Sequence, residues 1–176
     1  MKKIISTPIS LEDARSLNIG EVVYLTGVIY TLRDAGHKRL VELLEKGETL
    51  NVDLKGATVY YAGPCPTPPN KVIGSIGPTT SIRMDAYSPY LLKWGLKNMI
   101  GKGFRSQEVV DTVKEVEGLY LSAVGGAGAL MSKCVKSVEV VAFQDLGTEA
   151  LRRLEVFELP VIVSIDTKGN YIYREV

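Results

Sequence analysis

Apolar and polar positions alternate in short segments along this chain, and their spacing predicts strands interleaved with helices. Segments 21–30 and 57–62 are rich in β-branched and aromatic residues, which is typical of strands. Segments 34–46 and 106–116 carry apolar residues at helical spacing, the second behind a Ser106 cap. The pattern predicts an α/β domain with mixed strand pairing.

The remaining segments complete the expected order. We expect further strands at 4–9, 72–76, 99–100, 119–124, 137–143, 161–166 and 171–173. We expect further helices at 10–20, behind a Ser10 cap, at 81–96, shortly after Gly128, and from Thr148 onward. No repeat, linker or low-complexity tract interrupts the chain, so residues 1–176 are expected to form one domain.

Composition excludes several classes of protein. With 45% hydrophobic residues, 23% charged residues and a net charge of +1, the chain is typical of a water-soluble globular protein. A dedicated nucleic-acid binder would usually carry a basic stripe, so no nucleic-acid partner is expected. No apolar run approaches the roughly 20 residues that span a bilayer, so we expect no membrane insertion and a cytoplasmic protein.

Metal ligands are scarce. The chain has two cysteines, Cys65 and Cys134, far apart in sequence, and one histidine, His37. A zinc or iron–sulfur site usually needs three or four ligands, so any such cofactor would have to be held mainly by another chain. Both cysteines are expected to be inert thiols.

The segment from Gly77 to Asp85 carries the strongest chemical signal. Gly77 and Pro78 end an expected strand, and three hydroxyl residues, Thr79, Thr80 and Ser81, open the helix that follows. Free backbone N–H groups, hydroxyls and Arg83 one turn later can bind an anion. A plain helix cap uses the same residue types, so this pattern alone leaves both interpretations open.

Two further cations stand where an expected strand passes into a helix. Arg33 follows the strand at 21–30, and Lys102 lies between Gly101 and Gly103. The carboxyl ends of strands meet at one edge of an α/β sheet, where such folds bind ligands. Together with Arg83, these residues suit a small polyanion such as a dicarboxylate or phosphate ester. Taken singly, an ordinary surface charge is the favoured interpretation of each.

Two other features have weaker support. His37 is a candidate base, but neighbouring charges also fit an exposed helix face or a capping role. The run from Gly125 to Gly128 could cradle a phosphate, but it lacks the Lys-Ser/Thr of a P-loop and the spacing of GxGxxG. A tight turn between strand and helix is the favoured interpretation there.

The segment Gly77–Asp85 resembles the C-terminal, or β-subunit, portion of the iron–sulfur (class I) fumarases and their L-tartrate dehydratase relatives. Other stretches agree with that family in order along nearly the whole chain. They are 25–27, Arg33-Asp34 with 37–39, 61–64, 101–103 with 105–106, 125–126, 146–147 with 149–150, and 163–166.

The resemblance implies a swivelling β/β/α domain of three layers with mixed sheets, and reversible hydration of fumarate to L-malate. It implies that Thr79 is a catalytic acid/base and that Arg33, Arg83 and Lys102 bind substrate carboxylates. Thr80 and His37 are included as candidate substrate contacts. The family's [4Fe–4S] cluster would be held by a partner α subunit, which this chain would join in an α2β2-like hetero-oligomer.

Two alternatives remain open. The chain could be the β subunit of an L-tartrate dehydratase, although residues 102–106 look more like the fumarase version. It could also be a non-catalytic domain that binds an anionic metabolite or serves in assembly.

Overall fold

The computed structural model describes residues 1–123 and 128–173. Its strands are β1 (Ile4–Thr7), β2 (Val22–Thr31), β3 (Thr58–Tyr60), β4 (Asn98–Gly101), β5 (Leu119–Ser122), β6 (Val135–Ala142) and β7 (Leu151–Ile165). Its helices are α1 (Leu11–Ser16), α2 (Asp34–Glu45), α3 (Ser88–Trp94), α4 (Gln107–Val116) and α5 (Gly128–Ser132), with 3₁₀ helices η1 (Ser81–Ala86) and η2 (Gln144–Glu149).

The strands form a mixed sheet whose order is β1-β2-β3-β4-β5-β7-β6. From β1 to β5 each strand pairs in parallel with the next, whereas β7 runs antiparallel to β2, β5 and β6. Because β7 pairs with both β2 and β5, the hydrogen-bonded ladder β2-β3-β4-β5-β7 closes on itself. The predicted α/β class with mixed pairing is confirmed.

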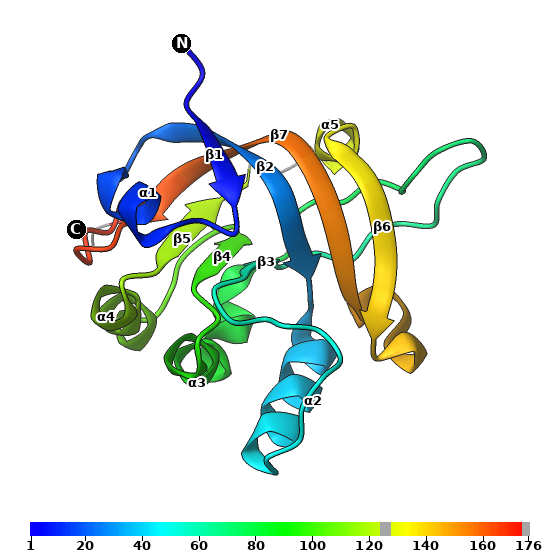
Figure 1. The fold of residues 1–176 in the computed structure, drawn as a ribbon, viewed down its shortest axis with the longest axis horizontal. Coiled ribbons are helices and arrows are strands. Elements are labelled where there is room, and N and C mark those ends of the chain that lie inside the picture. The colour runs from blue at the N-terminus through cyan, green and yellow to red at the C-terminus, as the bar shows by residue number, and fades with distance from the viewer. Residues whose placement is uncertain (124–127, 174–176) are drawn as a thin grey trace.

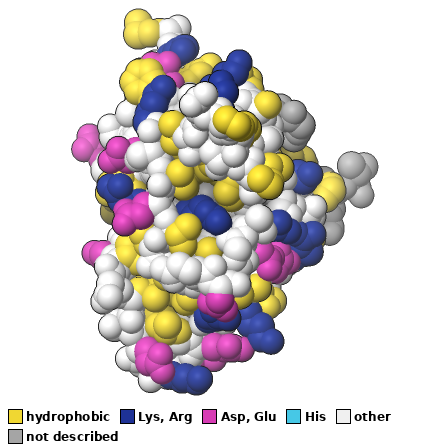
Figure 2. Space-filling view, turned by 90° about the vertical axis from the view of Figure 1, so that its right-hand side faces the viewer, with side chains coloured by type: hydrophobic (Ala, Val, Ile, Leu, Met, Phe, Trp, Pro, Cys, Tyr) yellow, Lys and Arg dark blue, Asp and Glu magenta, His cyan; other side chains and the backbone are white. Residues whose placement is uncertain are grey.

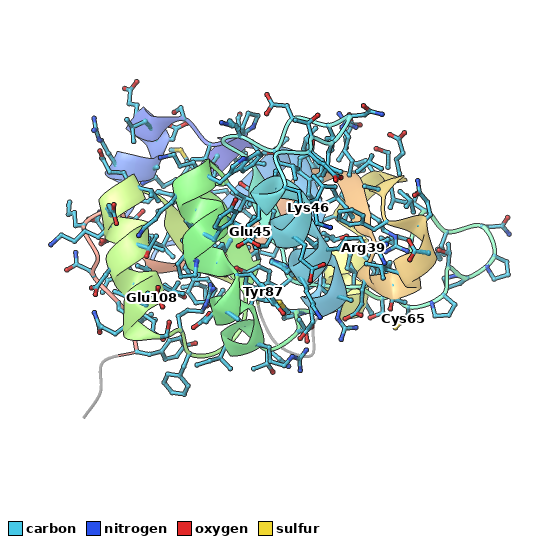
Figure 3. The ribbon with its side chains drawn as sticks, turned by 90° about the horizontal axis from the view of Figure 1, so that it is seen from below. Arg39, Glu45, Lys46, Cys65, Tyr87 and Glu108 are labelled. Atoms are coloured by element: carbon cyan, nitrogen blue, oxygen red, sulfur yellow. The ribbon has the colours of Figure 1, made fainter. Side chains whose placement is uncertain are left out.

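Each central strand is buried on both faces. Helices α2, α3 and α4 lie side by side across one face of the sheet (Figures 1 and 3). Successive residues such as Val59 and Tyr60, or Tyr120 and Leu121, belong to different apolar clusters, because strand side chains alternate between faces. One cluster packs among the strands and the other packs against these helices. This double burial explains the continuous apolar runs in the sequence.

Predicted helix caps at Ser10 and Ser106 are confirmed. The Ser10 hydroxyl accepts a hydrogen bond from the backbone N–H of Asp13 at 3.0 Å. The Ser106 hydroxyl accepts one from the backbone N–H of Val109 at 3.3 Å. Each satisfies a donor that the first helical turn would leave unpaired.

Three expected elements are corrected. No strand forms at 72–76: the segment runs as a loop, and its backbone pairs with the N–H of Cys65 and the carbonyl of Gly128 rather than with a strand of the sheet. The expected helix at 81–96 is split into η1 and α3, since the chain turns at Tyr87 and α3 restarts with Pro89 in its first turn. The helix expected from Thr148 is instead the 15-residue strand β7, which follows η2.

The two ends of the pattern also differ from expectation. Tyr171 makes a single bridge with Ile165 rather than beginning a strand. Residues 125–127 of the predicted glycine turn lie outside the described residues, and Gly128 begins α5.

The described surface carries mixed charge. On the face shown in Figure 2, basic and acidic side chains are interspersed rather than gathered by sign. Across the described residues, every helix is too short or too polar to cross a membrane.

Candidate active site at the carboxyl edge of the parallel strands

The parallel pairing brings the predicted cations to one edge. Arg33 follows the end of β2, Tyr61 follows β3, and Lys102 follows β4. Because these strands run in the same direction, their carboxyl ends open on the same edge of the sheet. Glycine 63, two residues beyond Tyr61, lies so close to Arg33 that a Cβ there would contact the arginine Cδ at 3.0 Å.

The Gly77–Ser81 segment lies between the ends of β3 and β4. The backbone N–H of Thr79 donates to the Tyr61 carbonyl at 2.8 Å, and Thr80 forms a parallel bridge with Lys102. The N–H of Ser81 donates to the Lys102 carbonyl at 3.0 Å, and the Lys102 N–H donates to Ser81 Oγ at 2.9 Å. The hydroxyl-rich segment is therefore held beside the cations by backbone contacts.

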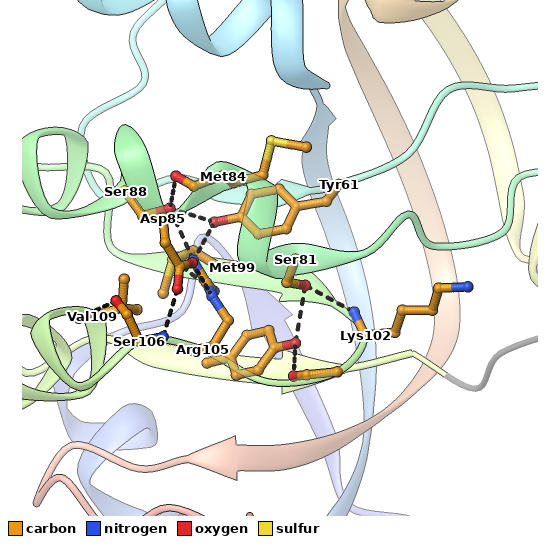
Figure 4. A network of polar contacts seen from close by, with 12 residues as sticks. Tyr61, Ser81, Met84, Asp85, Ser88, Met99, Lys102, Arg105, Ser106 and Val109 are labelled. Carbon is orange, nitrogen blue, oxygen red and sulfur yellow. Dashed lines mark hydrogen bonds and ion pairs between the residues drawn. The ribbon is translucent and has the colours of Figure 1, made fainter.

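Glycine is required on both sides of Lys102. A Cβ at Gly101 would overlap the Ser81 hydroxyl, so no larger residue fits without moving the segment. Gly103 has a φ of +84°, a left-handed conformation that side chains rarely adopt. Together they let Lys102 lie against Thr80 while its side chain extends away from the buried contacts (Figure 4).

Arg83 links two predicted site elements. Its Nη2 donates to Thr79 Oγ1 at 2.5 Å. Its Nε donates to Asp34 Oδ2 at 2.9 Å, and Nη2 also lies 3.4 Å from Asp34 Oδ1. The arginine and aspartate side chains are 47% and 35% exposed, so the pair lies at the surface. A guanidinium in this position favours negative charge on the Thr79 oxygen.

Arg33 is held less tightly. Its Nε lies 3.9 Å from Glu149 Oε1, too far for a hydrogen bond, and this buried Nε has no hydrogen-bond partner among the described residues. As the N-cap of α2, Arg33 uses its backbone carbonyl to accept the N–H of His37 at 2.8 Å. Its side chain as a whole is 31% exposed, so the guanidinium can turn toward a ligand.

His37 lies beneath this edge. The side chain is 2% exposed, and Nδ1 lies 2.9 Å from the Arg33 carbonyl. Burial, aided by the positive charge of Arg105, lowers the pKa of His37 to about 4. Its ring meets Tyr61 edge-on at 5.2 Å. The substrate contact of His37 stays a prediction, and the structure adds a supporting role for the neutral ring behind Arg33.

A buried arginine forms a second polar cluster that sequence reasoning missed (Figure 4). The Arg105 side chain is fully buried, and its Nε donates to Asp85 Oδ1 at 2.7 Å. Its Nη2 donates to Ser88 Oγ at 2.9 Å and to the Tyr61 hydroxyl at 3.2 Å. Its charge also stacks over the rings of Tyr61 and Tyr120. This cluster ties η1 and α3 to the end of β3.

The only sequence signal for this cluster is the position of Arg105, between a glycine turn and the Ser106 cap. Asp85 accepts from the backbone N–H of Ser106 at 2.5 Å, so it also fixes the start of α4. Partners this distant in sequence are invisible to local patterns.

The donor set of the described residues does not fit a metal cluster. Cys65 is exposed, Cys134 is half-buried, and both are free thiols. Within residues 1–123 and 128–173, no three or more His, Cys, Asp and Glu side chains gather where they could hold a metal ion.

Comparisons with known proteins show the family of this chain. The family model described as Fumarase C-terminus matches residues 2–176. The protein named "Putative L(+)-tartrate dehydratase subunit beta" of Methanocaldococcus jannaschii is 41% identical over 171 residues, or 94% of this chain and 88% of that protein. The aerobic class I fumarate hydratase of Escherichia coli is 40% identical over 154 residues, or 86% of this chain and 28% of that enzyme.

Fumarate hydratase 2 of Leishmania major is 38% identical over 159 residues, covering 89% of this chain and 28% of the enzyme. The chain therefore spans under a third of each of these two fumarate hydratases but most of the tartrate dehydratase subunit. With a family model matched over residues 2–176, the chain belongs to the fumarase C-terminus family.

Proposed function

We propose that this chain is the β subunit of a heteromeric hydro-lyase that interconverts fumarate and L-malate. The observation that carries the proposal is the contact between Arg83 and Thr79, at an edge that also presents Arg33 and Lys102. A reactive hydroxyl beside several cations suits proton transfer on a small dicarboxylate. The names of the relatives from Escherichia coli and Leishmania major support the same activity.

The residues of this chain have distinct roles in the proposal. Arg33 and Lys102 bind the substrate carboxylates, Arg33 by a two-pronged guanidinium contact and Lys102 as a point charge. Arg83 uses Nη2 for Thr79, and its Nη1, which has no partner among the described residues, faces the substrate. Thr79 acts as the alkoxide, which the guanidinium beside it stabilises: Oγ1 takes up the substrate proton to become the neutral hydroxyl, and in the reverse direction the hydroxyl returns that proton and becomes the alkoxide again.

The architecture and the cofactor follow the same proposal. The closed ladder with its one-sided helix layer supports a swivelling β/β/α domain of three layers. Since the donors of the described residues do not fit a [4Fe–4S] cluster, the cluster is assigned to a partner α subunit in an α2β2-like assembly.

A second candidate is L-tartrate dehydration. The Methanocaldococcus relative is named as a separate β subunit, and this chain spans 88% of it, whereas the matched fumarate hydratases are far longer. Both substrates are four-carbon dicarboxylates, so the same cations would serve either. A third candidate, anion binding without catalysis, would use Arg33 and Lys102 but leave Thr79 unused.

The decisive experiment is reconstitution with the partner. This chain is co-expressed with the proposed cluster-bearing α subunit, the cluster is rebuilt anaerobically, and fumarate, malate and L-tartrate are assayed. Thr79→Ala should lower turnover by about 10²-fold or more. Thr49→Ala, at an exposed threonine on the loop after α2, is the matched control.

Each candidate predicts a different result. Turnover of L-tartrate alone selects the second candidate, and absence of turnover with all three substrates selects the non-catalytic one. Turnover by Thr79→Ala within a few-fold of the wild type removes the proposed acid/base.

A further inference from the structure

We propose that Asp34 is a positioning residue that orients Arg83 toward both Thr79 and the substrate carboxylate. This inference rests on the proposed function and adds to it a residue that touches neither Thr79 nor substrate. The arrangement is a chain of three side chains in which Asp34 contacts Arg83 and Arg83 contacts Thr79.

The geometry of the arginine supports this role. Its Nε donates to Asp34 at 2.9 Å, and Nη2 bridges, with one hydrogen toward Asp34 at 3.4 Å and one toward Thr79 at 2.5 Å. A guanidinium is planar, so these contacts fix its plane and its direction together. Nη1 is thereby left as the donor edge for a ligand. Without the carboxylate, a side chain that is 47% exposed would sample other rotamers.

The aspartate is itself held in place. It is the first residue of α2, so the helix N-terminus stabilises its charge. That helix is anchored by its buried residues His37 and Leu40. Asp34 therefore presents its carboxylate from a rigid element, which is the requirement for positioning another side chain.

The charge of Asp34 matters as well as its shape. Arg33 is its neighbour in sequence and Arg83 is its ion-pair partner, so two positive charges that repel one another flank the carboxylate before substrate binds. An internal carboxylate offsets that repulsion and keeps Arg83 from turning away. The same carboxylate competes with the substrate for the guanidinium, so its removal should hurt turnover more than binding.

The test uses the assembled enzyme and three variants. Asp34→Asn keeps the size of the side chain but removes its charge, and Asp34→Glu keeps the charge. The matched control is Asp145→Asn, which removes the carboxylate that pairs with Arg39 of α2. We expect Asp34→Asn to lower kcat about 10-fold or more while KM changes by less than about 3-fold. Asp34→Glu should recover part of kcat, and Asp145→Asn should stay within about 2-fold of the wild type.

A second measurement does not depend on activity. In the uniformly ¹⁵N-labelled chain, the Arg83 Nε–Hε NMR signal should be rigid in the wild type and in Asp145→Asn, and mobile in Asp34→Asn. An inactive wild-type assembly would overturn the proposed function and leave this NMR comparison to decide the role of Asp34. An unchanged Arg83 signal in Asp34→Asn, or a kcat equal to that of Asp145→Asn, overturns the positioning role.

Discussion

Two arginine–aspartate pairs meet on the same short helix, and they differ in almost everything except their chemistry. In the first, Arg83 of η1 pairs with Asp34 of α2, and both side chains are substantially exposed. In the second, Asp85 of η1 pairs with Arg105, whose side chain is fully buried. The two η1 residues are separated by one position, so one helix faces both a solvated edge and the core.

The difference in burial indicates that one pair mainly stabilises the fold and that the other is available for binding and catalysis. The Arg105 guanidinium donates to Asp85, Ser88 and Tyr61, so few of its N–H groups are left to bind a ligand. A buried charge destabilises the fold if any of its partners is removed, because water cannot replace that partner. An exposed ion pair contributes only about 0–1 kcal/mol to the free energy of unfolding. We therefore expect the buried pair to dominate stability and the exposed pair to dominate activity.

The largest effect on stability is expected at the buried pair. Arg105→Met removes the charge and strands Asp85, whose side chain is only 9% exposed, without its partner. Breaking such a pair should lower the free energy of unfolding by about 3–5 kcal/mol. Urea unfolding of the isolated chain measures it. A loss below about 1 kcal/mol would remove the distinction between the two pairs.

The second effect concerns His37, whose buried ring lies against Tyr61 and is influenced by the charges of both Arg105 and Asp34. Its pKa falls from 6.5 to about 4 on folding because the ring is buried, so the native state resists a proton that the unfolded chain accepts. The stability that the neutral buried ring contributes is therefore fully present above pH 6.5 and is lost as pH falls toward 4. Stability should decrease by about 3 kcal/mol over that window.

The control for His37 is a variant that cannot titrate. His37→Gln should unfold with a shallower pH dependence between 6.5 and 4 than the wild type, whatever its absolute stability. Equal slopes for the two proteins would contradict a neutral buried ring.

A smaller effect is expected at Tyr61, whose backbone carbonyl accepts a hydrogen bond from Thr79 and whose hydroxyl accepts one from Arg105. Tyr61→Phe keeps the ring against His37 but removes a hydroxyl that contacts Ser88 at 3.0 Å and accepts from Arg105. The free energy of unfolding should fall by about 1–2 kcal/mol, as for a lost buried hydrogen bond. Tyr90→Phe, at an exposed tyrosine of α3, is the matched control and should be neutral in the same urea titration.

Much of the exposed edge follows from local patterns. Arg33 and Lys102 are each preceded by an apolar strand, and parallel pairing then fixes where they emerge. The caps at Ser10 and Ser106 depend on contacts three residues apart, which a sequence displays directly.

The buried cluster and the longest strand depend on distant partners. Strand β7 pairs with β2 and β6 from remote parts of the chain, and the sequence alone predicts only its end, as a strand at 161–166 that follows a helix from Thr148. Arg105 meets Asp85 and Tyr61 only because η1 and β3 lie beside it. Asp34 likewise belongs to the Arg33-Asp34 stretch that resembles the family, but the sequence gives no sign that it positions Arg83, which only their contact in the structure indicates.

The smallest effect on stability should accompany one of the largest effects on activity. Arg83→Met removes an exposed ion pair, so the free energy of unfolding should change by less than about 1 kcal/mol. In the assembled enzyme, the same change removes both a cation that faces the substrate carboxylate and the hydrogen-bond donor to Thr79. Turnover should therefore fall by about 10²-fold or more. Urea unfolding and steady-state kinetics on one preparation measure both. If Arg83→Met unfolded as easily as Arg105→Met, exposure would not separate the two pairs, and the division between a stabilising and a reactive side of η1 would be wrong.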